Sequence, residues 1–386
     1  MAVCLESYGI SRETGFIPSY DPSRQLNGVF EEWEELARQV PRFIAEKTFR
    51  MRAGQLKVIP EEAIDFASER EWWRAYVVIT YICQAYIWSE GDKGVVDVLP
   101  RRLAVPWCRV SRHLGVPPII THSTCLFNWK GDIYQCGSEN LKVDLSFTGT
   151  ADESWFFTTT LLVEMKAAKG IAIIPTVFQL MEEHNNQGLA EAMRSIEEAL
   201  GEMHGAMFKM KEHCKPAVFY SLLRPFLAGW KSNDALPSGL IYEGVDEQPQ
   251  MYNGGNAGQS SSIQAIDILL GLRHEGKDDS FIKEQRLHMP RKHRLFLEWL
   301  EEQPSLRQYI IHSNQKKLKE TYNQCIKAIE KFRSGHIQIV ALYILAQKNK
   351  VPGQTSLKAK GTAGSGIMPF LKKVRQDCVS ALLDTS

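Results

Sequence analysis

The chain has 386 residues, of which 46 are basic and 45 are acidic, so its formal net charge is +1. Nucleic-acid binders and polybasic membrane anchors need an excess of Lys and Arg, and this near balance argues against both classes. Hydrophobic residues make up 44% of the chain and charged residues 24%, which excludes disordered, collagen-like and disulfide-scaffold proteins. At about 150 residues per domain, the length predicts one large domain or two moderate ones.

Two features of the sequence bear on the compartment. The start of the chain has neither a basic segment nor an apolar run long enough for a secretory signal, and the eight cysteines are scattered without a Cys-x-x-Cys pair. We therefore expect reduced thiols in the cytoplasm. The most apolar stretch, 75–88, is shorter than the roughly 18 to 20 residues that cross a bilayer. It predicts a buried core helix and no membrane partner.

Apolar residues recur at helical spacing along most of the chain, which predicts an all-α fold. Turn-forming residues gather at 128–154, and there we place the boundary between a small N-terminal helical domain, 1–147, and a large C-terminal helical domain, 148–386. Long loops are expected at 232–262 and 348–368. The segments with helical spacing are 27–45, 61–90, 155–169, 187–211, 215–230, 259–273, 291–303 and 316–347.

Several common catalytic signatures are absent from the sequence. It contains no Gly-x-Ser-x-Gly elbow, no phosphate-binding Gly-rich loop ending in Lys-Ser or Lys-Thr, and no His-Glu-x-x-His motif. None of the ten histidines has a Glu three residues earlier, as helical di-iron proteins require. An aromatic-rich, all-α chain is then left with a bound organic or haem cofactor, or with a pure interaction role.

The helix expected at 316–347 carries His336 in the middle of an apolar face. Two interpretations remain open: a core histidine bonded to a backbone carbonyl, or an axial haem ligand, which a neutral imidazole on an apolar wall suits. Gly335 costs about 1 kcal/mol in a helix interior relative to Ala, which indicates that something bulky approaches there. The face comprises Tyr322, Cys325, Ile329, Phe332, His336, Ile339 and Tyr343.

Arg224 is the only charged residue in the apolar segment 217–230. A buried guanidinium without a partner is prohibitively unstable, so Arg224 is expected to face a carboxylate, which either the protein or a ligand supplies. Phe219 and Phe226 would form a flat apolar wall beside it. Aromatic rings next to a buried arginine suit an aromatic amino acid.

Three further features are less specific. Phe156 and Thr160 share one helix face, which core packing explains as well as a pocket does. The glycines of 254–262 allow a close approach of the backbone to a ligand, or simply form a helix entry. Asp267 lies in an apolar helix and needs a donor, for which the ring N–H of His336 is one candidate.

Motifs along nearly the whole chain resemble the indoleamine 2,3-dioxygenase family. The resemblance implies a small helical domain, a large helical domain that holds haem b, and cleavage of the indole C2–C3 bond of L-tryptophan by O2 to give N-formylkynurenine. The implied partners are tryptophan or another indoleamine, O2 and an electron donor for the haem, and we expect a monomer. The motifs are LAVPWCRVSRHLGVPPI, IPTVF, LAGWKSN, GLIYEGV, GGNAGQSS, RSGHIQIV and KAKGTAGSGIMPFLKKVR.

Carried over residue by residue, the resemblance gives His336 the role of proximal iron ligand and Arg333 that of a propionate partner. Gly255 belongs to the loop above the haem. Asn256 stands where the family usually has Ser, which adds an amide near a propionate.

For the substrate, the resemblance implies that Arg224 clamps the carboxylate while Phe219 and Phe156 form the wall. Thr160 keeps the hydroxyl of a distal residue that is usually Ser. Ala257 lies in the loop above the haem.

Three residues complete the implied pocket. Cys125 lies in its inner part, and His122 stands where many members have Tyr. Thr362 belongs to the Gly-rich segment 361–366, which matches a lid loop within 348–368.

Two alternatives stay open. The same fold serves as a myoglobin in some molluscs, so the chain is alternatively an oxygen carrier with weak or no dioxygenase activity. The sequence around Tyr242 fits a short phosphorylation motif, which allows a signalling scaffold.

Overall fold

The computed structural model describes residues 3–135, 140–348 and 366–385. Helices dominate these residues, and the strands assigned within them are four of two residues each. Strand β1 (Val98–Leu99) pairs in parallel with β4 (Ile241–Tyr242), and β2 (Trp129–Lys130) pairs antiparallel with β3 (Lys142–Val143). The all-α fold predicted from the helical spacing is confirmed.

The N-terminal part is built around α4 (Glu69–Trp88). Ser68 caps this helix in a capping box with Glu71, and side chains from Trp72 onward are buried almost without interruption. The apolar stretch 75–88 is thus a buried core helix, as predicted. Around it lie η1 (Leu5–Tyr8), η2 (Gly28–Phe30), α1 (Glu31–Arg38), α2 (Val40–Ala45), α3 (Phe49–Ala53), η3 (Glu61–Ala63), η4 (Asp92–Gly94), α5 (Arg101–Leu114) and α6 (His122–Phe127).

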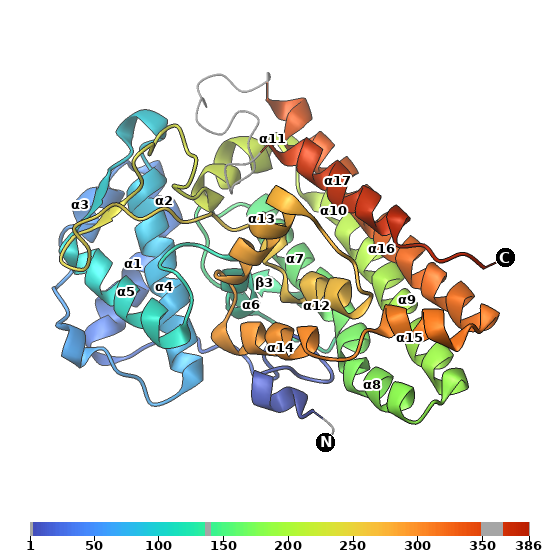
Figure 1. Cartoon of the computed structure of the whole chain (residues 1–386). Coiled ribbons are helices and arrows are strands. Elements are labelled where there is room, and N and C mark those ends of the chain that lie inside the picture. The colour runs from blue at the N-terminus through green and yellow to red at the C-terminus, as the bar shows by residue number, and fades with distance from the viewer. Residues whose placement is uncertain (1–2, 136–139, 349–365, 386) are drawn as a thin grey trace.

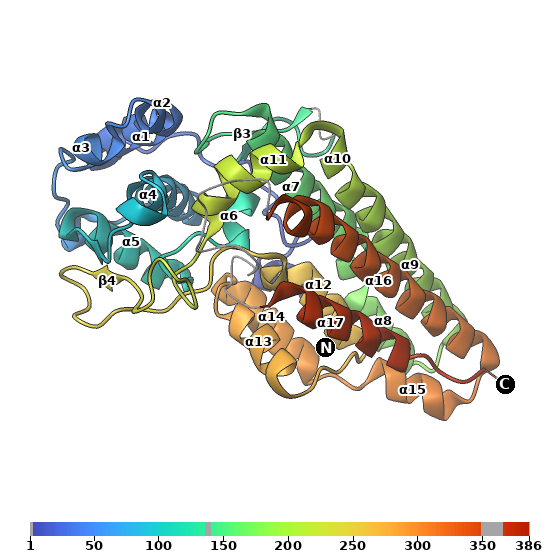
Figure 2. The same ribbon diagram turned by 90° about the horizontal axis from the view of Figure 1, so that it is seen from above.

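The C-terminal part is built on three long helices, α7 (Ala151–Ala172), α9 (Asn186–Phe208) and α16 (Lys316–Tyr343). Helix α9 packs against both α7 and α16, and α17 (Ile367–Ser380) packs against α16 (Figures 1 and 2). The remaining elements are α8 (Ile174–Glu182), α10 (Met210–His213), α11 (Pro216–Val218), η6 (Phe219–Leu223), η7 (Arg224–Leu227), η8 (Ala257–Gln259), α12 (Ser261–Leu269), α13 (Gly276–Arg286), α14 (Arg291–Glu301), α15 (Leu306–Ser313), η9 (Leu345–Gln347) and α17 (Ile367–Ser380).

The prediction of one continuous helix at 215–230 is wrong. The segment consists of α11, a π-helical turn in η6 and a 3₁₀ turn in η7. Pro225 explains the break, because it has no N–H to donate to the carbonyl four residues earlier and its ring clashes with that carbonyl. The irregular backbone places Arg224 at the junction between two kinds of turn.

Contacts between the two parts of the chain are numerous. β4 crosses to the N-terminal side to pair with β1, and the rings of Tyr8 and Phe296, on η1 and α14, have centroids 5.6 Å apart (Figures 1 and 2). Helices α1 to α5 lie on one side of the molecule and α8, α9 and α15 to α17 on the other. The division at 147/148 stays a prediction.

Candidate active site

His336 lies on α16 and is half-buried. Burial, together with the charge of Arg333, lowers the pKa of His336 to about 4, so the imidazole is neutral near pH 7. Among the described residues, 3–135, 140–348 and 366–385, none forms a hydrogen bond with the ring of His336. The interpretation of a core histidine bonded to a backbone carbonyl is therefore not supported. A neutral ring with an available nitrogen fits an axial ligand of haem iron.

Gly335 has a different role from the one expected. A Cβ atom at this position would lie 2.8 Å from Met207 Cε and 2.9 Å from Phe208 Cε2, both on α9. The bulky group that approaches is therefore protein, and the glycine allows α16 and α9 to pack closely.

Asp267 does not pair with His336. Its Oδ2 accepts a 2.5 Å hydrogen bond from Nη2 of Arg333, which lies one turn before His336 on α16. Nη1 of Arg333 donates to the carbonyl of Val374 at 3.1 Å and contacts Sγ of Cys378 at 2.7 Å, both on α17. The prediction that the carboxylate of Asp267 accepts a hydrogen bond from the ring of His336 is wrong. Arg333 lies on the same helix and reaches Asp267 instead, and its charged guanidinium is the stronger donor.

His274 extends this charged cluster. Its Nδ1 lies 2.7 Å from Oδ2 of Asp377, and its Nε2 lies 3.9 Å from Oδ2 of Asp267. Burial lowers the pKa of His274, but the two carboxylates outweigh that effect and raise the pKa above its usual value. The cluster connects α12, α16 and α17 beside His336.

Arg224 is 1% exposed, and its guanidinium lies 4.9 Å from the centroid of the Tyr220 ring. Burial lowers the pKa of Arg224, although Tyr220 partly opposes this. The ring of Phe219, one turn earlier, lies 4.9 Å from that of Phe156 on α7. Phe226 instead stacks on Phe147 at 4.8 Å. The structure thus packs two of the predicted aromatic residues, Phe219 and Phe156, against each other, and Arg224 lies in the turn that follows that of Phe219.

Thr160 lies one turn after Phe156 on α7, and both side chains are half-buried. The hydroxyl of Thr160 donates to the backbone carbonyl of Phe156 at 2.9 Å. Because this bond uses the hydroxyl proton of Thr160, the oxygen can only accept a hydrogen bond from a further neighbour on this helix face.

The loop before α12 is fixed by its own polar groups. Oδ1 of Asn256 accepts from the N–H of Gly258, and Nδ2 donates to the carbonyl of Gly254 and to Oε1 of Gln285, each at 2.9 Å. The amide expected near a propionate is thus occupied by protein. Gly255 is half-buried, and Ala257 is exposed at the start of η8.

Sequence reasoning missed Glu164, which is buried on α7 one turn after Thr160. Its carboxylate bonds Nε2 of His122 at 2.8 Å and the hydroxyls of Ser260 and Ser262 at 2.5 and 2.6 Å. Sγ of Cys125 donates to the carbonyl of His122 at 2.9 Å. The only hint in the sequence was an acidic residue on the Phe156–Thr160 face.

The sequence model of one protein family, described as indoleamine 2,3-dioxygenase, matches residues 4–381. The chain belongs to the indoleamine 2,3-dioxygenase family. Indoleamine 2,3-dioxygenase 1 of Rattus norvegicus is 36% identical, with 98% of this chain and 96% of that protein covered, and indoleamine 2,3-dioxygenase 2 of Homo sapiens is 35% identical, with 98% and 95% covered. A myoglobin of Haliotis madaka is 32% identical, with 97% of each chain covered.

These matches confirm the predicted indoleamine 2,3-dioxygenase family and the prediction that the chain is an enzyme of the dioxygenase class. The oxygen-carrier alternative is not favoured, because the myoglobin matches less closely than the dioxygenases of rat and human.

The signalling interpretation of Tyr242 does not fit this member of the indoleamine 2,3-dioxygenase family. Tyr242 is 1% exposed, and its hydroxyl donates to the carbonyl of Pro118 at 2.6 Å. A kinase cannot reach this oxygen in the folded chain. Thr362 and most of the lid loop expected at 348–368 lie outside the described residues.

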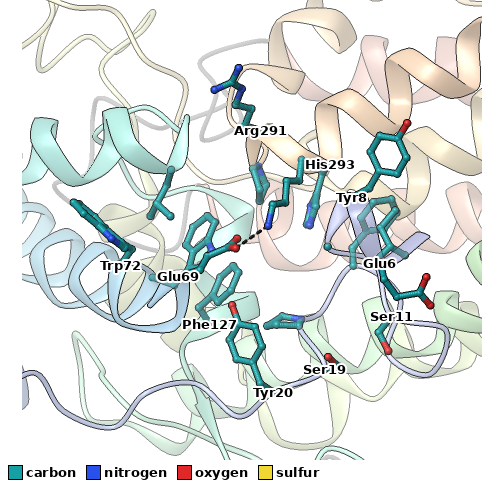
Figure 3. A pocket seen from close by; sticks show the side chains of 18 of the residues that line it. Glu6, Tyr8, Ser11, Ser19, Tyr20, Glu69, Trp72, Phe127, Arg291 and His293 are labelled. Carbon is teal, nitrogen blue, oxygen red and sulfur yellow. Dashed lines mark hydrogen bonds and ion pairs between the residues drawn. The ribbon is translucent and has the colours of Figure 1, made fainter. Parts of the chain in front are cut away.

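The structure contains a cavity of about 870 Å³ (Figure 3). It is bordered by the N-terminal segment, the starts of α4 and α14 and the end of α5, and Lys292 bonds Glu69 across it at 2.7 Å. None of the predicted site residues lines it.

In the described part of the chain, no helix is long and apolar enough to cross a membrane.

Proposed function

We propose that this chain is a haem-dependent dioxygenase that cleaves the C2–C3 bond of L-tryptophan with O2 to give N-formylkynurenine, the first step of the kynurenine pathway. The observation that carries the proposal is the combination of a neutral, half-buried His336 on α16 with a buried Arg224 that follows Phe219 in the chain, while the ring of Phe219 packs on that of Phe156. Bound haem would supply the activation of O2, and an electron donor would keep its iron ferrous.

His336 would hold the iron on one side. Its pKa of about 4 keeps the imidazole neutral at neutral pH, so one of its two ring nitrogens is unprotonated, as ligation requires. Arg333, one turn before His336, forms an ion pair with Asp267, and this pair would place a fixed charge distribution beside the bound haem. We propose that Gly255 and Asn256 border the haem from the loop before α12.

Arg224 would bind the carboxylate of the substrate. Burial destabilises the charged guanidinium of Arg224, as its lowered pKa indicates. A carboxylate beside the guanidinium would stabilise that charge again. Phe219 and Phe156 would flank the indole ring and exclude water from it. This arrangement selects a zwitterionic aromatic amino acid or a related indoleamine.

The remaining residues would shape the pocket. Thr160 uses its proton on Phe156 and so presents an oxygen acceptor. Cys125 is buried, and burial raises the pKa of its thiol, so it would be a neutral wall rather than a nucleophile. We assign pocket positions also to His122 and Ala257. We propose that the enzyme works in the cytoplasm, where its thiols stay reduced.

The direct test uses haem-loaded, reduced protein with L-tryptophan and ¹⁸O₂. We expect a product heavier than tryptophan by two labelled oxygen atoms. Reversible O2 binding without consumption of tryptophan would contradict the proposal and would indicate an oxygen carrier.

A further inference from the structure

The cavity of about 870 Å³ has an apolar floor and a charged rim (Figure 3). Its volume falls within the roughly 300 to 1,000 Å³ that is typical of small-molecule sites. The floor residues are each at most 5% exposed, and they are Phe16, Trp72, Trp73, Phe127 and His293. Among the described residues, the rim carries three acidic and three basic side chains, all exposed: Glu6, Glu13, Glu69, Arg12, Arg291 and Lys292.

The aromatic rings of the floor hold one another in place. The rings of Trp73 and Phe127 stack with their centroids 3.9 Å apart, and the ring of Phe16 lies 4.7 Å from that of His293. Because these rings are already packed, the floor can receive a ligand without first being ordered, which favours affinity. Aromatic side chains pack well against another aromatic ring. The floor therefore fits a flat aromatic molecule.

His293 supplies a polar group within this apolar floor. It is 4% exposed, and its ring points from α14 into the cavity (Figure 3). Nδ1 lies 3.1 Å from Oγ of Ser261, whereas Nε2 has no hydrogen-bond partner among the described residues. Burial lowers the pKa of His293 to about 3, so the ring is neutral near pH 7 and carries one proton.

The contact with Ser261 indicates which nitrogen of His293 carries that proton. Ser261 is 4% exposed, and in the described part of the chain its hydroxyl contacts no other hydrogen-bonding group. If Nδ1 held the proton, the hydroxyl proton of Ser261 would be buried without an acceptor, which is costly. The hydroxyl therefore donates to Nδ1, and Nε2 presents an N–H to the cavity. An oxygen of a ligand would satisfy this donor.

The rim does not select a strongly charged ligand, because its acidic and basic side chains balance. Lys292 bonds Glu69 at 2.7 Å, and Arg12 lies 3.5 Å from Glu6. We propose that this cavity is a binding site for an uncharged aryl carbonyl compound, whose ring lies on the aromatic floor and whose carbonyl oxygen accepts a hydrogen bond from Nε2 of His293. This site goes beyond the proposed dioxygenase function and does not depend on it.

The test compares benzophenone with diphenylmethane, which has the same two rings but a CH₂ group in place of the carbonyl. Both are titrated by calorimetry into the haem-loaded protein. We expect wild-type protein to bind benzophenone about tenfold more tightly, the usual effect of one hydrogen bond. His293→Phe should abolish this preference. His293→Gln should keep it, because the side-chain amide can place an N–H where Nε2 lies.

His288→Phe is the matched control. His288 is also a buried histidine, 3% exposed, whose pKa burial lowers to about 4, but it does not line the cavity. This variant should keep the wild-type preference. Equal affinities of wild-type protein for the two compounds, or an unchanged preference in His293→Phe, would overturn the proposal.

A second measurement locates the ligand without any variant. Irradiated benzophenone reacts with C–H bonds next to it, and mass spectrometry of the digested wild-type protein then identifies the labelled peptides. We expect labels on peptides that contain floor residues, such as Phe16 or Phe127. Labels confined to peptides that contribute no residue to the cavity would overturn the proposal.

Discussion

Arg74 in the N-terminal part and Arg224 in the C-terminal part are both buried arginines, 2% and 1% exposed. Arg74 donates to Glu34 at 2.8 and 2.6 Å and to Asp144 at 2.6 Å. Burial opposes its charge, yet the two carboxylates outweigh burial and raise the pKa of Arg74. The pKa of Arg224 is instead lowered by burial.

We propose that this difference separates a structural arginine, Arg74, from a substrate-binding one, Arg224. The fold favours the charged form of Arg74 more than water does, so that charge belongs to the stability of the protein. The fold favours the charged form of Arg224 less than water does, so a substrate carboxylate that binds beside the guanidinium would stabilise its charge. Burial alone does not distinguish the two arginines, whereas the opposite directions of their pKa shifts do.

Arg74→Leu should have the largest effect on stability. It leaves Glu34 and Asp144 buried without their shared cation, which typically costs about 3 to 5 kcal/mol. Urea unfolding measures this loss directly, with Arg42→Leu, at a surface ion pair, as a control that should change stability by less than about 1 kcal/mol. Equal effects of the two substitutions would remove the structural role of Arg74.

Arg224→Leu should act on the ligand rather than the fold. We expect tryptophan affinity to fall by about 100-fold, corresponding to lost charge-assisted hydrogen bonds, with a much smaller change in unfolding free energy than Arg74→Leu causes. Calorimetric titration and urea unfolding of the same sample give both numbers. Unchanged affinity would contradict the clamp.

Gly335→Ala tests the packing of α16 against α9 next to the proposed iron ligand. Its Cβ would come within 3.0 Å of Met207 and Phe208, so we expect a loss of about 1 to 3 kcal/mol from strain between α16 and α9. Gly201→Ala is the matched control, since a Cβ there meets nothing within 4 Å and should stabilise α9 by up to about 1 kcal/mol. Thermal unfolding compares the two variants, and a harmless Gly335→Ala would argue against the close packing.

Acidification should weaken the C-terminal part. Burial lowers the pKa of His288 to about 4 and that of His293 to about 3, both below the unfolded value near 6.5. The unfolded chain therefore binds more protons between about pH 6.5 and 4, and stability falls as the pH drops, by at most about 1.4 kcal/mol per pH unit for each group. His293→Gln should flatten that slope in urea unfolding measured across this pH range; a slope identical to wild type would show that His293 does not titrate on unfolding.

The all-α fold and the residues of the proposed site could be read from helical spacing and motifs, because both depend on local sequence. The partner of Asp267 could not, since Arg333 and His336 are one turn apart on the same helix and spacing does not choose between them. Glu164 escaped notice because its donors are 42, 96 and 98 residues away in the chain. The break at Arg224 required weighing Pro225 against an otherwise helical pattern.

The most direct test of His336 as the iron ligand is the absorption spectrum of His336→Gly protein, reconstituted with haem in the presence and absence of imidazole. His336 is assigned as the iron ligand because its ring is neutral and has no hydrogen-bond partner among the described residues. We expect the variant to lose the wild-type haem spectrum and added imidazole to restore it. A wild-type spectrum in the variant without imidazole would show that another residue ligates the iron.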